Sequence, residues 1–112
     1  MKYIITLMIL FSSMVTLSMA KITYEEIIPQ LNPCKPYVIE TASEPSSVCC
    51  AVLKGLDEVA SGSKEDRKDI CEILKTAANK LPIKIDKANF RLPSICGLHT
   101  LTHIDRNMNC NV

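Results

Sequence analysis

Aromatic residues are scarce in this sequence. It has no tryptophan, and beyond residue 20 its only aromatic side chains of the Phe and Tyr type are Tyr24, Tyr37 and Phe90. A core built from this part of the chain must therefore be mainly aliphatic. There is also no Asn-x-Ser/Thr sequon, so N-glycosylation is not expected, and no internal repeat or low-complexity segment is present.

An excess of charge of one sign is also absent. The chain has thirteen Lys and Arg against twelve Asp and Glu, and removal of Lys2 with the first twenty residues leaves twelve against twelve. Attraction to nucleic acid or to an anionic membrane needs a basic field, so neither partner is expected. The zero net charge also argues against membrane disruption of the antimicrobial type.

The first twenty residues have the pattern of a secretory signal peptide. Lys2 gives a positive start, residues 3–17 are nearly all apolar or hydroxylated, and Ser18 and Ala20 give a small-x-small ending. The apolar run of about fifteen residues is shorter than the roughly 20 needed to cross a bilayer, which argues against a membrane anchor. We therefore expect cleavage after Ala20, a single domain at residues 21–112, and a secreted, extracellular protein.

Six cysteines lie in the predicted mature part: Cys34, Cys49, Cys50, Cys71, Cys96 and Cys110. An even number in a secreted chain predicts three disulfides. There is no Cys-x-x-Cys pair, and the two histidines lie far from most of the cysteines, so a zinc site is not expected, and no cofactor is indicated. Six cysteines allow 15 connectivities, but the adjacent Cys49 and Cys50 should bond to two different partners.

Hydrophobic spacing and capping residues predict helices in the first half of the chain. A capping box at residues 23–26 opens the first helix, although Pro29 either kinks it or moves its start to a later residue. Ser43 or Ser46 caps a second helix, which ends at Ser61-Gly62.

Two further helices are predicted before an irregular tail. Ser63 opens the third with Asp66 in the Glu position of a capping box, and Pro82 stops it. The fourth is expected over residues 83–90, capped near Asp86 and ended by Leu92-Pro93. From Gly97 the apolar residues have no clear period. Periodicity alone favours an ordinary packed core for all of these helices.

Four motifs follow one another along the chain. They are Leu-Asn-Pro-Cys-Lys-Pro-Tyr at 31–37, Ser-Lys-Glu-Asp-Arg at 63–67, Cys-Glu-Ile-Leu-Lys at 71–75 and Leu-Pro-Ser-Ile-Cys-Gly at 92–97. Together with the cysteine order they resemble the plant eight-cysteine proteins, in particular the type 1 nonspecific lipid-transfer proteins. The resemblance extends from about Tyr24 to Val112. It implies an all-α fold of four short helices in a compact disulfide-stapled bundle around an apolar tunnel, with an irregular C-terminal segment.

Two cysteines of that family are missing here. The family's first cysteine falls at Tyr24 and its sixth at Ile73, and in the type 1 proteins these two are bonded to each other. The resemblance therefore implies the remaining type 1 pairs, which are Cys34–Cys49, Cys50–Cys96 and Cys71–Cys110. We expect the side chains of Tyr24 and Ile73 to touch, and the first helix to be held less tightly than in the family.

The resemblance also implies a function. It predicts a monomer that holds one fatty acid or lysophospholipid in the tunnel and contacts membrane surfaces transiently. The tunnel-lining residues that it implies are Ile27, Leu31, Leu53, Leu56, Ala60, Ile70, Leu74, Ala77, Leu81 and Ile104.

One polar residue stands out at the implied tunnel mouth. The resemblance assigns Arg67 to the lipid head group, and a guanidinium suits a carboxylate or a phosphate. The alternative is a surface arginine paired with Asp66 or Asp69. The family's head-group tyrosine is replaced by Thr102, and His103 is the neighbouring residue that could substitute for it.

Other functions have weaker support in the sequence. A secreted defence protein or enzyme inhibitor, with a collapsed cavity and a protein partner, would need an exposed inhibitory loop, and no feature marks one. Catalysis is not expected, because no cysteine is left over as a nucleophile. His103 and Asp105 also lack a serine partner in a recognisable context.

Overall fold

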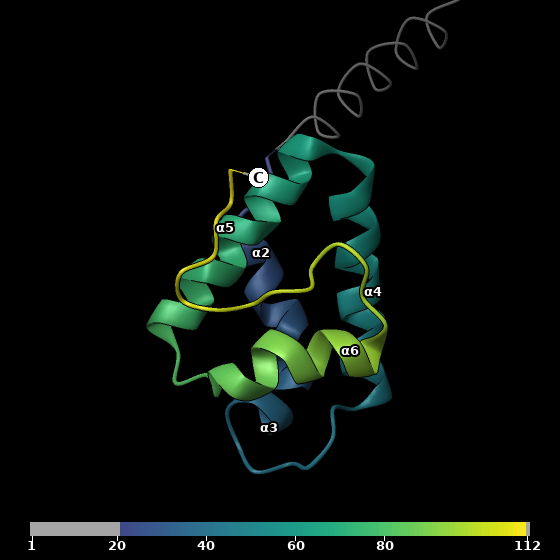
Figure 1. Ribbon diagram of the computed structural model, residues 1–112, viewed down its shortest axis with the longest axis vertical. Helices are drawn as coiled ribbons and strands as arrows, with labels where there is room; N and C mark the ends of the chain where they lie inside the picture. The colour runs from purple at the N-terminus through teal and green to yellow at the C-terminus, as the bar shows by residue number, and fades with distance from the viewer. Residues whose placement is uncertain (1–20, 112) are drawn as a thin grey trace, which may run out of the picture.

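The computed structural model describes residues 21–111, so the predicted signal peptide lies outside the described residues. Within residues 21–111 the chain is helical and irregular, with no strand (Figure 1). None of the helices in this part is long and apolar enough to cross a membrane. In chain order the elements are α2 (Tyr24–Ile27), the 3-10 helix η1 (Ile28–Cys34), α3 (Lys35–Val38), α4 (Ser47–Gly62), α5 (Lys64–Lys80), the π-helix η2 (Lys87–Arg91) and α6 (Leu92–Cys96).

The first helical segment, α2–η1–α3, is one continuous run whose centre is tightened to 3-10 geometry. Pro29 and Pro33 lie within this central part and cannot donate a backbone hydrogen bond, which explains why a regular α-helix is not kept. Thr23 does occupy the N-cap position, but its side chain makes no capping hydrogen bond, so the predicted capping box is wrong. Its backbone carbonyl instead accepts the N–H groups of Glu26 and Ile27.

The two long helices begin where serine caps predict. The hydroxyl of Ser46, rather than Ser43, accepts the N–H of Cys49 at 3.0 Å and starts α4. The hydroxyl of Ser63 accepts the N–H of Asp66 at 3.3 Å and starts α5 directly after α4 ends. In Figure 1 α4 and α5 converge where one helix follows the other and stand on either side of the molecule.

The fourth helix does not stop at Leu92-Pro93, which corrects the prediction. It continues to Cys96 and ends at Gly97, whose φ of 71° is the left-handed conformation that glycine adopts most easily. The preceding π-helical turn explains the continuation. In it the N–H of Leu92 donates to the carbonyl of Lys87, five residues back, and Pro93, which has no N–H to offer, falls in the first turn of the new α-helix, where none is required.

The predicted cap of the fourth helix is also wrong. The side chain of Asp86 makes no capping hydrogen bond. The first turn is closed instead by the carbonyl of Lys84, which accepts the N–H groups of Lys87 and Ala88, each at 3.1 Å.

Three disulfides link the elements, and their pairing confirms the one implied by the family resemblance. The bonds are Cys34–Cys49 from η1 to α4, Cys50–Cys96 from α4 to α6, and Cys71–Cys110 from α5 to the C-terminal segment. No cysteine in residues 21–111 is free. Two of the bonds therefore link α4 to other helices, and the third links α5 to the C-terminal segment.

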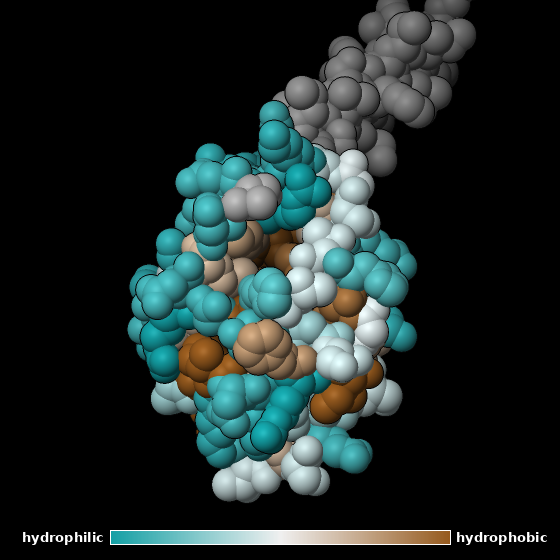
Figure 2. All heavy atoms as spheres, viewed as in Figure 1, coloured by the Kyte–Doolittle hydropathy of each residue, from teal (hydrophilic) through white to brown (hydrophobic). Residues whose placement is uncertain are grey.

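The core is aliphatic. Its buried apolar side chains form one cluster that takes residues from every helical element and from the C-terminal segment, and Tyr37 is its single fully buried aromatic residue among those described. Figure 2 shows hydrophobic patches on one face that are separated by hydrophilic side chains.

The two positions of the missing family cysteines lie near each other. Tyr24 and Ile73 line the same surface hollow, Ile73 is buried, and Tyr24 packs half-buried against the core. The ammonium group of Lys80 lies 5.4 Å from the centroid of the Tyr24 ring. Direct contact between the side chains of Tyr24 and Ile73 stays a prediction.

Restoring this link should stabilise the fold. In the double variant Tyr24→Cys with Ile73→Cys, we expect a fourth disulfide that raises the free energy of unfolding by up to about 4 kcal/mol, because it closes a long loop in the unfolded chain. Urea denaturation with thiol titration measures both effects. The matched control, Tyr24→Ser with Ile73→Ser, should be less stable than the wild type. Two free thiols in the folded cysteine variant would show that these positions are too far apart.

Candidate apolar binding cavity

An apolar cavity of about 230 Å³ lies between the first helical segment, the two long helices and the fourth helix. It is larger than an engineered apolar cavity of about 150 Å³ that binds benzene. Its lining residues are Ile28, Leu31, Asn32, Cys34, Lys35, Val38, Ile39, Leu53, Leu74, Ala77, Leu81, Ile83, Ala88, Leu92 and Ile104. All but Asn32 and Lys35 are apolar.

The lining divides into a buried floor and an accessible rim. The floor consists of the buried residues Cys34, Val38, Leu53, Leu74, Ala77, Ala88, Leu92 and Ile104. The rim consists of the half-buried residues Ile28, Leu31, Ile39, Leu81 and Ile83 with the exposed Asn32 and Lys35. The cavity therefore opens between the first helical segment and the chain that follows α5.

Six of the ten apolar residues assigned to the tunnel line this cavity: Leu31, Leu53, Leu74, Ala77, Leu81 and Ile104. The other four are buried elsewhere. Ile27 and Leu56 line a separate surface hollow between the N-terminal part of the first helical segment and α4, and Ala60 and Ile70 are fully buried in the core. These four support the fold around the cavity but do not line it.

The sequence prediction missed much of the wall supplied by the first helical segment. Residues 28, 31, 32, 35, 38 and 39 all line the cavity and recur at helical spacing. Three prolines interrupt this stripe, and a proline-rich stretch argues against a continuous helix. The stripe of Ile28, Leu31, Val38 and Ile39 was nevertheless the signal that could have revealed the wall.

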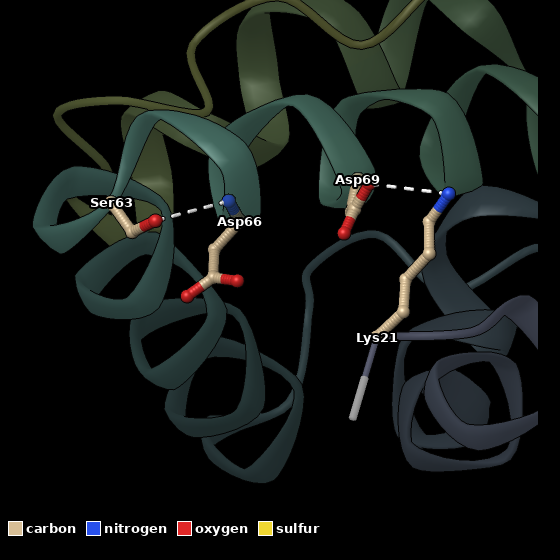
Figure 3. A network of polar contacts seen from close by, with 4 residues as sticks. All are labelled: Lys21, Ser63, Asp66 and Asp69. Carbon is tan, nitrogen blue, oxygen red and sulfur yellow. Dashed lines mark hydrogen bonds and ion pairs between the residues drawn. The ribbon is translucent and has the colours of Figure 1, made fainter. Parts of the chain in front are cut away.

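Arg67 lies in a different place. It lines a second hollow of about 350 Å³ with Thr102, His103 and other residues of the C-terminal segment, and this hollow shares no lining residue with the apolar cavity. Among residues 21–111 no ion pair joins Arg67 to Asp66 or Asp69. Asp69 faces Lys21 at 3.8 Å instead, and Asp66 lies at the Ser63 cap (Figure 3).

The imidazole of His103 packs against an aromatic ring. Its ring meets the exposed Phe90 ring edge-to-face, with the centroids 5.9 Å apart. The second hollow thus gathers a guanidinium, an imidazole and the hydroxyl-bearing Thr100 and Thr102 on one surface. Residues 21–111 contain no group of three His, Cys, Asp or Glu side chains placed to hold a metal ion.

A single buried carboxylate positions the C-terminal segment. Asp57 on α4 is 7% exposed, and it accepts the backbone N–H groups of His99 (2.9 Å), Thr100 (2.9 Å) and Leu101 (2.7 Å). Burial raises the pKa of Asp57. The three backbone N–H groups and the nearby His99 together lower this pKa by more than burial raises it, so it lies below its ordinary value. The carboxylate is therefore ionised in the folded protein at neutral pH.

This anchor matters for both hollows. The segment that it fixes carries Ile104 to the cavity floor and Thr102 to the Arg67 hollow. The sequence prediction missed Asp57, although it interrupts the apolar stripe of Leu53, Leu56 and Ala60 on α4. A carboxylate on a buried helix face needs hydrogen-bond donors, and that was the available signal.

The fold and the cavity define a small helical protein, closed by disulfides, with an internal apolar site. The model of the protease inhibitor/seed storage/LTP family matches residues 16–110. The non-specific lipid-transfer protein AP10 of Helianthus annuus is 36% identical over 108 residues, which cover 96% of this chain and 90% of that protein. The chain therefore belongs to the plant nonspecific lipid-transfer proteins within this family.

Further relatives agree with this assignment. The non-specific lipid-transfer protein of Pinus taeda is 32% identical over 91 residues, covering 80% of this chain and 72% of that protein. Among solved structures, non-specific lipid transfer protein 1 from barley, in complex with a lysophosphatidylcholine, superimposes with a TM-score of 0.69. It is 25% identical, and the match covers 80% of this chain and 97% of the barley chain.

Removing the Asp57 carboxylate should destabilise the protein. In Asp57→Ala three buried N–H groups lose their acceptor, and we expect the free energy of unfolding to fall by about 2–3 kcal/mol. The exposed neighbour Glu58 provides the control, since Glu58→Ala should change it by less than about 0.5 kcal/mol. Urea denaturation with the disulfides intact measures both, and equal losses in the two variants would contradict the assigned role.

The same carboxylate predicts a pH dependence. Because the pKa of Asp57 is lower in the folded than in the unfolded protein, its contribution is present above the unfolded pKa and is lost as the pH falls through the folded value. We expect the stability difference between the wild type and Asp57→Asn to be constant from about pH 7 to 5 and to shrink below about pH 4. A difference that stays constant down to pH 2 would assign the acid sensitivity to other groups.

Proposed function

We propose that this protein binds one acyl lipid in the apolar cavity and carries it through water. The observation that supports this best is the floor, where eight buried and nearly all aliphatic residues surround a space that opens at an accessible rim. Family membership supports the same function, and the barley relative of the same fold holds a lysophosphatidylcholine.

The chemistry requires no reaction. Each methylene group moved from water into the cavity contributes roughly 0.8 kcal/mol, and aliphatic walls have no directional contacts that select one chain. We therefore propose low specificity for the acyl chain, with a fatty acid or a lysophospholipid as the ligand.

The proposed contacts with the acyl chain are a subset of the residues assigned from the sequence. Leu31, Leu53, Leu74, Ala77, Leu81 and Ile104 would contact it directly, whereas Ile27, Leu56, Ala60 and Ile70 would support the walls from behind. The family resemblance assigns the head group to Arg67, which faces a separate hollow. Arg67 would therefore contact a head group only in that hollow, outside the apolar cavity.

We propose further that the protein is secreted after cleavage following Ala20 and that it acts as a monomer made of residues 21–112. Its three disulfides suit an oxidising compartment. Its contact with membranes would be transient, and the face drawn in Figure 2 agrees with this, because its hydrophobic patches are separate from one another, whereas large continuous patches mark interaction sites.

The alternative of a defence protein or enzyme inhibitor assumed a collapsed cavity and a protein partner. A cavity of about 230 Å³ with an aliphatic lining favours lipid binding over this alternative.

Native mass spectrometry of the oxidised mature protein tests the proposal. With lysophosphatidylcholine or a C16 fatty acid we expect a one-to-one adduct. Ala77→Phe fills the floor and should weaken the adduct at least tenfold, whereas Ala51→Phe, on the exposed side of α4, should leave it unchanged. The intact mass reports the three disulfides, and far-UV circular dichroism reports the fold of each variant.

Two outcomes would count against lipid binding. One is the lack of any adduct with correctly oxidised, helical protein. The alternative of a defence protein or enzyme inhibitor with a protein partner would then replace lipid binding. The other is an adduct that survives in folded Ala77→Phe. Should that variant fail to fold, Leu81→Trp at the half-buried rim blocks the opening with less strain in the core.

A further inference from the structure

The wall of the apolar cavity contains one charged side chain. Of its fifteen lining residues only Lys35 carries a charge, and it lies at the exposed rim, as does Asn32. Within residues 21–111, the ammonium of Lys35 has no ion pair. A cation at the edge of an otherwise aliphatic site is poorly explained by packing alone.

Two neighbouring lysines also form no ion pair within residues 21–111, but their ammonium groups have other partners. The ammonium of Lys84 donates to the carbonyl of Glu40 at 2.7 Å, and that of Lys87 donates to the carbonyl of Ala42 at 2.9 Å while lying 4.8 Å from the centroid of an aromatic ring. Both therefore tie the loop after α3 to the start of the fourth helix. Unlike these two lysines, Lys35 donates no side-chain hydrogen bond among the contacts described for residues 21–111, and it lines the cavity.

Backbone contacts fix the rim on both sides of the opening. The N–H of Lys84 donates to the carbonyl of Val38 at 2.7 Å, so the chain after α5 is joined to α3 next to Ile39 and Ile83 of the rim. The disulfide at Cys34 holds the residue before Lys35 against α4. The backbone of Lys35 is thus held in place at the exposed rim of the opening.

We infer that the cavity takes anionic lipids with the head group at the rim, where the ammonium of Lys35 and the amide of Asn32 contact a carboxylate or a phosphate. The acyl chain then runs toward Leu53, Leu74 and Ile104 on the floor. Opposite charge and a strong donor supply the attraction, and the head stays in water while the chain is buried. This inference rests on the proposed lipid binding and adds the head-group class and the orientation.

Pairs of one charged and one neutral ligand distinguish a failure of this inference from a failure of the proposed lipid binding. At pH 8, dissociation constants are measured for C16 fatty acid and its methyl ester, and for C16 lysophosphatidic acid and the uncharged monoacylglycerol. We expect each anion to bind about three- to tenfold more tightly than its neutral partner. Lys35→Met should remove this preference and leave the neutral ligands unaffected. Lys54→Met, an exposed lysine of α4 away from the cavity lining, should keep it.

The two anions distinguish the source of the charge. If Lys35→Met loses the preference for the fatty acid alone, the rim binds a carboxylate. If it loses the preference for the lysophosphatidic acid alone, the rim binds a phosphate. If it loses both preferences, the rim accepts either group. An unchanged preference in Lys35→Met overturns the inference. If the preference disappears in Arg67→Met instead, the head group lies at the second hollow, so the inference is overturned while the proposed lipid binding stands. If no ligand binds, neutral or charged, the proposed function itself fails.

Nitroxide-labelled stearic acids test the orientation without any substitution. A label near the carboxyl group should broaden the amide NMR signals of Asn32 and Lys35. A label near the methyl end should broaden those of Leu74 and Ile104. The reverse pattern would overturn the inference.

Discussion

The structure depends on covalent links that compensate for an incompletely filled centre. Protein interiors are normally packed to high density, and a cavity forfeits the dispersion contacts of the side chains that surround it. Here three disulfides connect η1, α4, α5, α6 and the C-terminal segment, and cross-links of this kind limit the freedom of the unfolded chain. The aliphatic floor can therefore stay open to a ligand without the helices collapsing onto it.

Hydrogen bonds from polar side chains fix the chain in two segments that lie outside the helices. The irregular segment after Gly97 offers backbone N–H groups that no helix satisfies, and the Asp57 carboxylate accepts three of them in succession. At the opposite end, Lys84 and Lys87 fix the loop after α3 through its carbonyl oxygens. One carboxylate on α4 and two lysines at or just before the start of the fourth helix thus give definite positions to two segments that have no regular structure.

Local features of the fold could be predicted from the sequence, and several longer-range ones could not. The caps at Ser46 and Ser63 act within one turn, so the sequence is sufficient to locate them. The end of the fourth helix depends on a π-helical turn, which places Pro93 in the first turn of a new α-helix instead of at a helix end. No local rule predicts this turn. The disulfide pairing followed from family resemblance rather than from spacing. Six of the ten assigned wall residues line the observed cavity. Asp57 was overlooked because its role depends on a distant segment that faces it.

The positions of the disulfides have a consequence for resistance to proteases. The loop at residues 39–46 lies inside the Cys34–Cys49 ring, and the stretches at 81–84 and 97–109 are likewise enclosed by the other two bonds. Cutting the backbone once in any of these connections, or at Ser63 between the long helices, leaves both fragments joined through sulfur. A nicked molecule would keep its mass apart from one added water, and its halves would remain in register, so damage at the exposed turns does not by itself disperse the wall of the cavity.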